Sequence, residues 1–255
     1  MLDVPMPELA ARSQWVLSIL PPSDALAFAA RYKAAAPAQS KLRVAFADCN
    51  AVSPETVKKI AALFAGSGTG FVDAGIIGGP PKDGYDPVFY ASAAPEVSDL
   101  LDDFAGLSKY GLKVSPLRGE GAGVGDASAL KMSYAGISKG IIGLTTTMIL
   151  AAHASSPATA QALIHELHSS QPQILQRITT SVPTMLPKAY RWVGEMEEIS
   201  SFVGGGEGQI HQGLARLYER VERSLKEEQE GGPAEDVKVL RGFVDDAKAV
   251  IGGQK

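Results

Sequence analysis

The feature that most constrains the fold is a change of pattern near residue 117. Before it, short runs rich in β-branched and aromatic residues alternate with stretches of helical spacing, and after it no convincing strand is present. Strands that alternate with short helices predict a parallel or mostly parallel sheet. We therefore expect an α/β part followed by an all-α part. The predicted strands are WVLSIL from Trp15, LRVAFAD from Leu42, FVDAGII from Phe71, PVFYAS from Pro87 and GLKVS from Gly111.

Two helices are predicted between these strands. In SPETVKKIAALFAG, Ser53 is placed as an N-cap, Pro54 occupies the first helical position, and Gly66 marks the end. APEVSDLLDDFAG repeats this design. Its apolar residues recur at helical spacing and predict one buried face, formed by Val97, Leu100, Leu101 and Phe104.

A long helix of about eight turns is predicted from Asp126, after the glycine-rich linker RGEGAGVG. Gly136, Gly140 and Gly143 are spaced so that another helix can approach closely. The stretch from Gly140 to residue 156 is short for a membrane span and rich in Thr, Gly and Ser, so we interpret it as part of a buried helix. Further helices are predicted near residues 157–169, 171–181 and 184–203. Two more helices follow, each with one apolar stripe: Leu214, Leu217, Val221 and Leu225 in the first, and Val237, Leu240, Val244 and Ile251 in the second.

Composition excludes several classes of protein. A formal net charge of −4, without a basic stripe, argues against a nucleic-acid-binding protein. The single cysteine, Cys49, excludes an internal disulfide, and no apolar signal core follows the start, so we expect a cytoplasmic protein. The four histidines form no HExxH motif, and G-x-S-x-G is absent, which argues against a metal centre and a serine hydrolase.

Two stretches could carry chemistry. Lys131 lies one turn into the long helix among apolar residues, and burial would lower its pKa toward the range of a general base. The alternative is a lysine that extends along an apolar helix to reach solvent. The second stretch is FVDAGIIGGPP, where Gly78 and Gly79 follow a predicted strand. Such a loop is either a ligand-binding loop at the carboxyl end of a strand or a structural turn.

Taken together, these motifs resemble the β-hydroxyacid dehydrogenase superfamily, which includes 3-hydroxyisobutyrate dehydrogenase and 6-phosphogluconate dehydrogenase. The resemblance rests on FVDAGIIGGPP followed by GEGAGVGDASALKMSYAG, and it covers nearly the whole chain. LRVAFADCNAVSPETVKKIAALFA is similar to the family's strand–turn–helix with D-x-S/N-x-x-S-P. LKMSYAGISKG and YRWVGEMEEI are most similar to a branch with a phosphogluconate-dehydrogenase-like C-terminal domain.

The resemblance implies a partial NAD(P)-binding Rossmann-like domain over residues 1–117 and an all-α domain over 118–255, joined by the long helix. It implies hydride transfer between a hydroxyacid-type substrate and NAD or NADP. Separately, the long helix from Asp126 is apolar on nearly every face, so we expect a homodimer formed through the all-α part, with neither nucleic acid nor membrane as a partner. Lys131 matches the catalytic lysine. The other matching positions are Gly78 and Gly79 in the substrate loop, Asn50 near the nicotinamide and substrate, and Pro21 and Pro22 along the cofactor.

Three departures from the family pattern matter. Ile77 and Ala135 stand where many relatives place a Ser and an Asn that bind substrate; Tyr134 or Lys139 could replace these contacts, and we choose Tyr134 as the substrate-binding candidate. The sequence also contains no G-x-G-x-x-G, the turn that holds the dinucleotide pyrophosphate.

We therefore expect the first βαβ unit to be missing, nucleotide binding to be weak, and WVLSIL to form an uncovered, apolar sheet edge. Two hypotheses follow: an oxidoreductase with Lys131 as acid/base, or a non-catalytic remnant that forms dimers.

Overall fold

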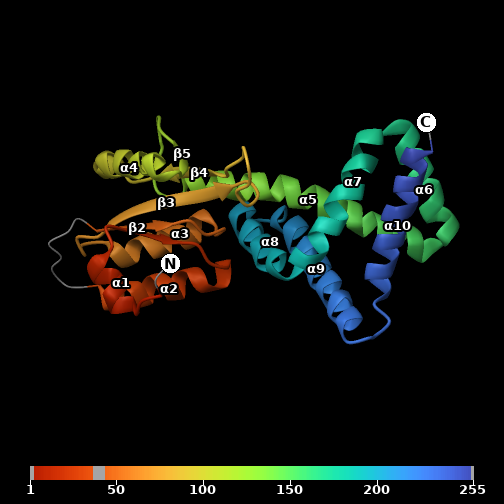
Figure 1. Cartoon of the computed structure of the whole chain (residues 1–255), viewed down its shortest axis with the longest axis horizontal. Coiled ribbons are helices and arrows are strands. Elements are labelled where there is room, and N and C mark those ends of the chain that lie inside the picture. The colour runs from red at the N-terminus through yellow and green to blue at the C-terminus, as the bar shows by residue number, and fades with distance from the viewer. Residues whose placement is uncertain (1–2, 37–43, 254–255) are drawn as a thin grey trace. The chain divides into compact units, whose positions relative to one another are not determined.

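The computed structural model describes residues 3–36 and 44–253 of the 255-residue chain (Figure 1). The chain divides into two compact units. Unit 1 comprises Met1–Tyr134 with Ser201–Gly204, and unit 2 comprises Ala135–Ser200 with Gly205–Lys255. The five strands of the described residues all lie in unit 1, whereas the described part of unit 2 is helical. The predicted fold class, α/β followed by all-α, is confirmed.

The sheet of unit 1 contains all five predicted strands, in the order β1-β2-β3-β4-β5. Strands β1, β2 and β3 are parallel, β4 is antiparallel to β3, and β5 is parallel to β4. The sheet is therefore mostly parallel, as expected. The bounds are β1 Trp15–Ser18, β2 Ala45–Asp48, β3 Gly70–Ile77, β4 Val88–Ser92 and β5 Lys113–Pro116; Leu42, where the second predicted strand begins, lies outside the described residues.

Helices cover both faces of this sheet (Figure 1). On one face, α1 (Met6–Arg12), α2 (Pro22–Ala35) and α3 (Pro54–Phe64) enclose a core in which the Phe46 and Phe64 rings stack 4.8 Å apart. On the other face lies α4 (Ser98–Ala105), flanked by the short helices η1 (Pro95–Val97) and η2 (Gly106–Tyr110). The predicted N-cap of α3 is confirmed, because the Ser53 hydroxyl accepts a hydrogen bond of 3.2 Å from the Thr56 N–H.

Strand β1 lies at the edge of the sheet. Among the described residues it pairs with β2 alone, in the register Trp15 to Ala45. Its side chains alternate between the two cores: Val16 joins the core with α2, and Trp15 packs against the core with α4. The prediction that WVLSIL forms an edge strand is confirmed.

Helix α5 (Asp126–Ser155) is a single 30-residue helix whose first residues belong to unit 1 and whose remainder belongs to unit 2. The predicted length is confirmed, but the interpretation of the stretch from Gly140 as a buried helix is wrong. Leu144 and Met148 are 60% and 51% exposed, and Ile141 is also exposed. One stripe of the helix is covered by its own chain, and the opposite stripe is left open.

Unit 2 packs its helices against the covered stripe of α5. The predicted role of the glycines is confirmed, because a Cβ on Gly136 would touch Ile199 and His211, and a Cβ on Gly143 would lie 2.7 Å from Leu214. The remaining helices are α6 Pro157–Ser170, α7 Pro172–Met185, η3 Leu186–Lys188, α8 Ala189–Val203, α9 Gly208–Gln229 and α10 Glu235–Gly252. Helix α7 continues beyond its predicted end at residue 181 and includes Pro183.

Candidate functional site

The start of α5 is attached to strand β3 through Asp73. This carboxylate is fully buried and accepts four hydrogen bonds: from the Gly125 N–H (2.9 Å), the Ser128 N–H (3.1 Å), the Ser128 hydroxyl (2.7 Å) and the Ser92 hydroxyl (3.1 Å). The first N–H groups of a helix have no partner within the helix. Asp73 accepts one of them, from Ser128, together with the N–H of Gly125 directly before the helix, so the position of α5 in unit 1 is tied to β3.

Lys131 lies one turn further along α5, against the same strand. Its ammonium donates a hydrogen bond of 2.5 Å to the backbone carbonyl of Ile76. A Cβ on Gly75 would lie 2.8 Å from the Ala127 carbonyl oxygen and 3.0 Å from the Lys131 Cβ, so glycine is needed for this close approach. The Lys131 side chain is half-buried, and its head group lies at the carboxyl end of β3. That end is where open α/β sheets bind ligands.

Burial raises the pKa of Asp73, although its hydrogen bonds to Ser128, Ser92 and Gly125 act in the opposite direction. Burial, with the nearby carboxylates of Asp48 and Asp73, raises the pKa of the Cys49 thiol well above its ordinary value. Cys49 is therefore a neutral core thiol rather than a thiolate nucleophile.

Asn50 follows β2, the strand next to β3. Its amide donates to the Ser18 hydroxyl (2.9 Å) and to the Asp48 carboxylate, and its carbonyl accepts the Leu20 N–H (2.6 Å). Asn50 is almost completely buried. These bonds tie the end of β2 to the loop after β1, so Asn50 orders this part of the sheet edge and directs its amide inward.

Pro21 and Pro22 end that loop and begin α2, as its N-cap and its first residue. Neither proline has a backbone N–H, so the helix start lacks two of the donors that bind anions at other helix ends. This helix start therefore offers few N–H donors to a pyrophosphate. Because the sequence also contains no G-x-G-x-x-G turn, the described residues fit only part of a dinucleotide.

The Gly78–Gly79 segment is exposed, but a side chain contacts its backbone. The Gly79 N–H donates to the Tyr85 hydroxyl (3.2 Å), and a Cβ on Gly78, whose φ is 135°, would clash with that same hydroxyl. Tyr85 belongs to the connection between β3 and β4, which folds back on itself.

The remaining candidates lie apart from these contacts. Tyr134 is 53% exposed, whereas Ala135 is buried and offers no polar group. In unit 2, the Lys139 ammonium forms an ion pair with the buried Glu195 carboxylate and lies 5.4 Å from the centre of the Trp192 ring. Lys139 is thus engaged in the interior of unit 2 and is a poor candidate for a substrate contact.

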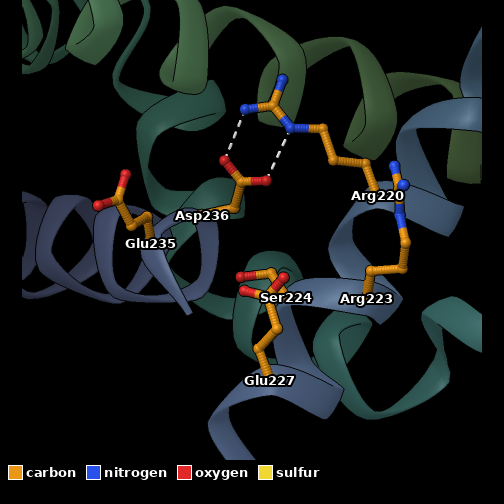
Figure 2. Close-up of a pocket in the computed structure, with 6 residues that line it drawn as sticks. All are labelled: Arg220, Arg223, Ser224, Glu227, Glu235 and Asp236. Atoms are coloured by element: carbon orange, nitrogen blue, oxygen red, sulfur yellow. Dashed lines mark hydrogen bonds and ion pairs between the residues drawn. The ribbon is translucent and has the colours of Figure 1, made fainter. Parts of the chain in front are cut away.

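Unit 2 also carries a surface pocket of about 330 Å³ between α9 and α10 (Figure 2). Figure 2 shows the Arg220 guanidinium facing the Asp236 carboxylate, with which it forms two hydrogen bonds of 2.7 and 2.6 Å. The Ser224 hydroxyl accepts the Val237 N–H near the start of α10 (3.2 Å). The polar groups mainly join two helices, so we assign this pocket a structural role.

Two residues of this region were not identified from the sequence: Asp73 in β3, which anchors α5, and Tyr85 in the β3–β4 connection, which contacts Gly79. Asp73 had one signal in the sequence, an acid placed directly after a buried apolar run. Its partners Ser92, Gly125 and Ser128 lie 19, 52 and 55 residues away, so local pattern could not identify them. Tyr85 carried no signal of its own.

Comparison with known families gives one match. Residues 154–221, most of which belong to unit 2, match the family model described as a domain of unknown function (DUF1932). No curated protein sequence matches the chain.

Solved structures resemble the chain over most of its length. The conserved protein MTH1747, described as structurally similar to 3-hydroxyacid dehydrogenases, has a TM-score of 0.60 and 23% identity, covering 87% of this chain and 80% of that one. A conserved hypothetical protein from Sinorhizobium meliloti has a TM-score of 0.63 and 18% identity, covering 93% and 77%. The 3-hydroxyisobutyrate dehydrogenase of Mycobacterium tuberculosis, solved with L-serine, has a TM-score of 0.55 and 14% identity, covering 93% and 81%. At these identities, the likeness establishes a shared fold.

Proposed function

From the fold that this chain shares with 3-hydroxyacid dehydrogenase-like proteins, we propose that it acts as an NAD(P)-dependent oxidoreductase on a hydroxyacid-type substrate. Lys131 exchanges a proton with the substrate hydroxyl. NAD or NADP, when bound, supplies the hydride acceptor. Gly78, Gly79 and Tyr134 are the proposed substrate-binding residues, and Pro21, Pro22 and Asn50 line the cofactor side of the site.

The observation that supports this proposal is the position of Lys131. Its ammonium lies 2.5 Å from the Ile76 carbonyl, at the carboxyl end of β3. Asn50 follows the carboxyl end of the adjacent parallel strand β2, so both lie at the same edge of the sheet. A lysine that is half-buried and held by a backbone acceptor can donate or accept a proton at a defined point.

Nucleotide binding tests the proposal. In calorimetric titration, we expect this chain to bind NADH and NADPH with dissociation constants above the micromolar range, because its sequence contains no G-x-G-x-x-G turn to bind the pyrophosphate. The same chain joined to a G-x-G-x-x-G nucleotide-binding segment should bind one of them in the micromolar range. If the joined protein binds neither nucleotide, the oxidoreductase proposal is wrong and the non-catalytic alternative is favoured.

The open stripe of α5 matters for both hypotheses: the dimeric enzyme, and the alternative of a non-catalytic protein that forms dimers. We define this stripe as Tyr134, Ile137, Ile141, Leu144 and Met148, which are 37% to 67% exposed. Their spacing alternates between three and four residues, as in the seam of a coiled coil. By length and composition α5 would also suit a membrane span, with 33% of its most apolar window buried in the chain. We propose that a second copy of the chain covers the stripe instead.

This homodimer gives a direct prediction. Leu144→Glu places a charge in the centre of the stripe, so it should convert a dimer of the chain into a monomer in light scattering at micromolar concentration. Ile210→Glu is the matched control, because Ile210 is 65% exposed on α9 outside the stripe. A monomer in the unmodified protein, or an unchanged mass in Leu144→Glu, would count against the α5 interface.

A further inference from the structure

The Tyr85 hydroxyl lies over the backbone where an open glycine loop would receive a ligand. It accepts the Gly79 N–H at 3.2 Å and leaves no room for a side chain on Gly78. A ligand carboxylate that approached Gly79 would therefore meet a phenol first. The hydroxyl would lie between the Gly79 N–H and such a carboxylate.

Tyr85 is held in this position by a tight turn. The Lys82 N–H donates to the Tyr85 carbonyl (3.0 Å), and the Tyr85 N–H donates to the Lys82 carbonyl (2.9 Å). Gly84 between them has a φ of 74°, in the left-handed region that favours glycine. The Lys82 ammonium lies 5.9 Å from the centre of the Tyr85 ring. Tyr85 is 40% exposed, so a small solute can reach it.

The chemistry of this arrangement favours an anion. A tyrosine hydroxyl has one proton to donate and can accept hydrogen bonds as well. When it accepts the Gly79 N–H, its oxygen is polarised and its own proton becomes a better donor. The positive charge of Lys82 adds to the attraction of a negatively charged group. Hydrogen bonds to charged groups are also stronger than those between neutral groups.

We propose that Tyr85 binds the carboxylate of the substrate through its hydroxyl, with the Gly79 N–H behind it and Lys82 alongside. The assignment rests on the proposed function, because it places the carboxylate near the proton donor Lys131. Ile76, which accepts the Lys131 hydrogen bond, precedes Gly79 by three residues, so at most about 11 Å of backbone separates the two anchors. Tyr85 would thereby replace a contact that Ile77 and Ala135 cannot make.

Amide NMR of the full chain, labelled with ¹⁵N, tests this proposal without turnover. The probe is 3-hydroxypropionate, and the neutral control is 3-hydroxypropionamide. We expect the carboxylate to shift the Gly79 amide signal with millimolar affinity, and the amide to have little effect. Tyr85→Phe removes only the hydroxyl and should weaken binding roughly tenfold. Tyr110→Phe, which alters a tyrosine that is 84% exposed in the same unit, should leave binding unchanged.

The proposal is overturned if the Gly79 signal does not move with up to about 50 mM of 3-hydroxypropionate, a range that covers weak binding by so small a molecule. It is also overturned if Tyr85→Phe binds as tightly as the unmodified chain, or if the neutral amide binds as well as the acid. Lys131→Met separates this proposal from the proposed function. If Lys131→Met keeps the Tyr85-dependent binding while the nucleotide tests fail, the carboxylate site stands and the oxidoreductase assignment does not.

Discussion

Lys131→Met should lower kcat by roughly 100- to 10,000-fold, the range that a positioned general acid or base contributes. The measurement uses the chain joined to a G-x-G-x-x-G nucleotide-binding segment, with whichever hydroxyacid proves active. Methionine keeps the length and apolar character of the lysine stem, so packing against Gly75 changes little while the ammonium at the Ile76 carbonyl is lost. Nucleotide affinity should change little, because the Lys131 ammonium lies at the Ile76 carbonyl in β3, whereas Pro21 and Pro22 lie at the start of α2.

The controls separate chemistry from folding. Lys109→Met removes an exposed lysine from unit 1 and should leave kcat unchanged. Lys139→Ala should lower kcat much less than Lys131→Met. Its main effect should fall on the stability of unit 2, because the buried Glu195 carboxylate would lose its partner. Near-full turnover in Lys131→Met would show that the lysine is not the acid/base, and the alternative of a lysine that extends toward solvent would replace it.

Asp73→Ala should reduce the free energy of unfolding of unit 1 by about 3 kcal/mol or more. Two N–H groups and two hydroxyls would lose a buried acceptor, and each unsatisfied buried donor costs about 1–3 kcal/mol. The two tryptophans make the measurement specific, because Trp15 lies in unit 1 and Trp192 in unit 2. Urea unfolding followed by fluorescence in a Trp192→Phe background reports on unit 1 alone.

Asp102→Ala is the matched control for Asp73→Ala. Asp102 forms an exposed ion pair with Arg118 in the same unit, and such pairs contribute at most about 1 kcal/mol. In a Trp15→Phe background, where Trp192 reports on unit 2, Asp73→Ala should leave the transition nearly unchanged. Equal effects of Asp73→Ala and Asp102→Ala on unit 1 would contradict the role of Asp73 as the anchor of α5.

The strands of this protein could be predicted from sequence because each is a short run of β-branched and aromatic residues between clear turn signals. The close packing at the α5 glycines could also be predicted, because Gly136, Gly140 and Gly143 lie on one helix face and indicate a closely packed neighbour. The exposure of Leu144 and Met148 could not be predicted. An apolar residue at helical spacing is compatible with burial in its own chain or in a partner, and the pattern does not distinguish the two.

Candidate site residues could be proposed from the sequence only where local pattern indicates them. Lys131 and the Gly78–Gly79 loop were identified through a resemblance in order and spacing. The contact between Gly79 and Tyr85 depends on how a ten-residue connection folds back, which follows from the turn at Gly84 and not from any periodicity. The inward direction of the Asn50 amide depends on Ser18, 32 residues away. Such long-range polar contacts leave no repeating signal in the sequence.

The attachment of α5 to a single strand also affects which parts of the chain can vary. Asp73, Gly75 and Ile76 are consecutive or alternate residues of β3, and together they hold the start of the helix and the head of Lys131. The linker from Arg118 to residue 122 adds little to this hold. Insertions or deletions in that linker would therefore leave Lys131 in place, whereas a one-residue slip within β3 would move it. A change in the length of this loop is thus compatible with a fixed position of the Lys131 ammonium.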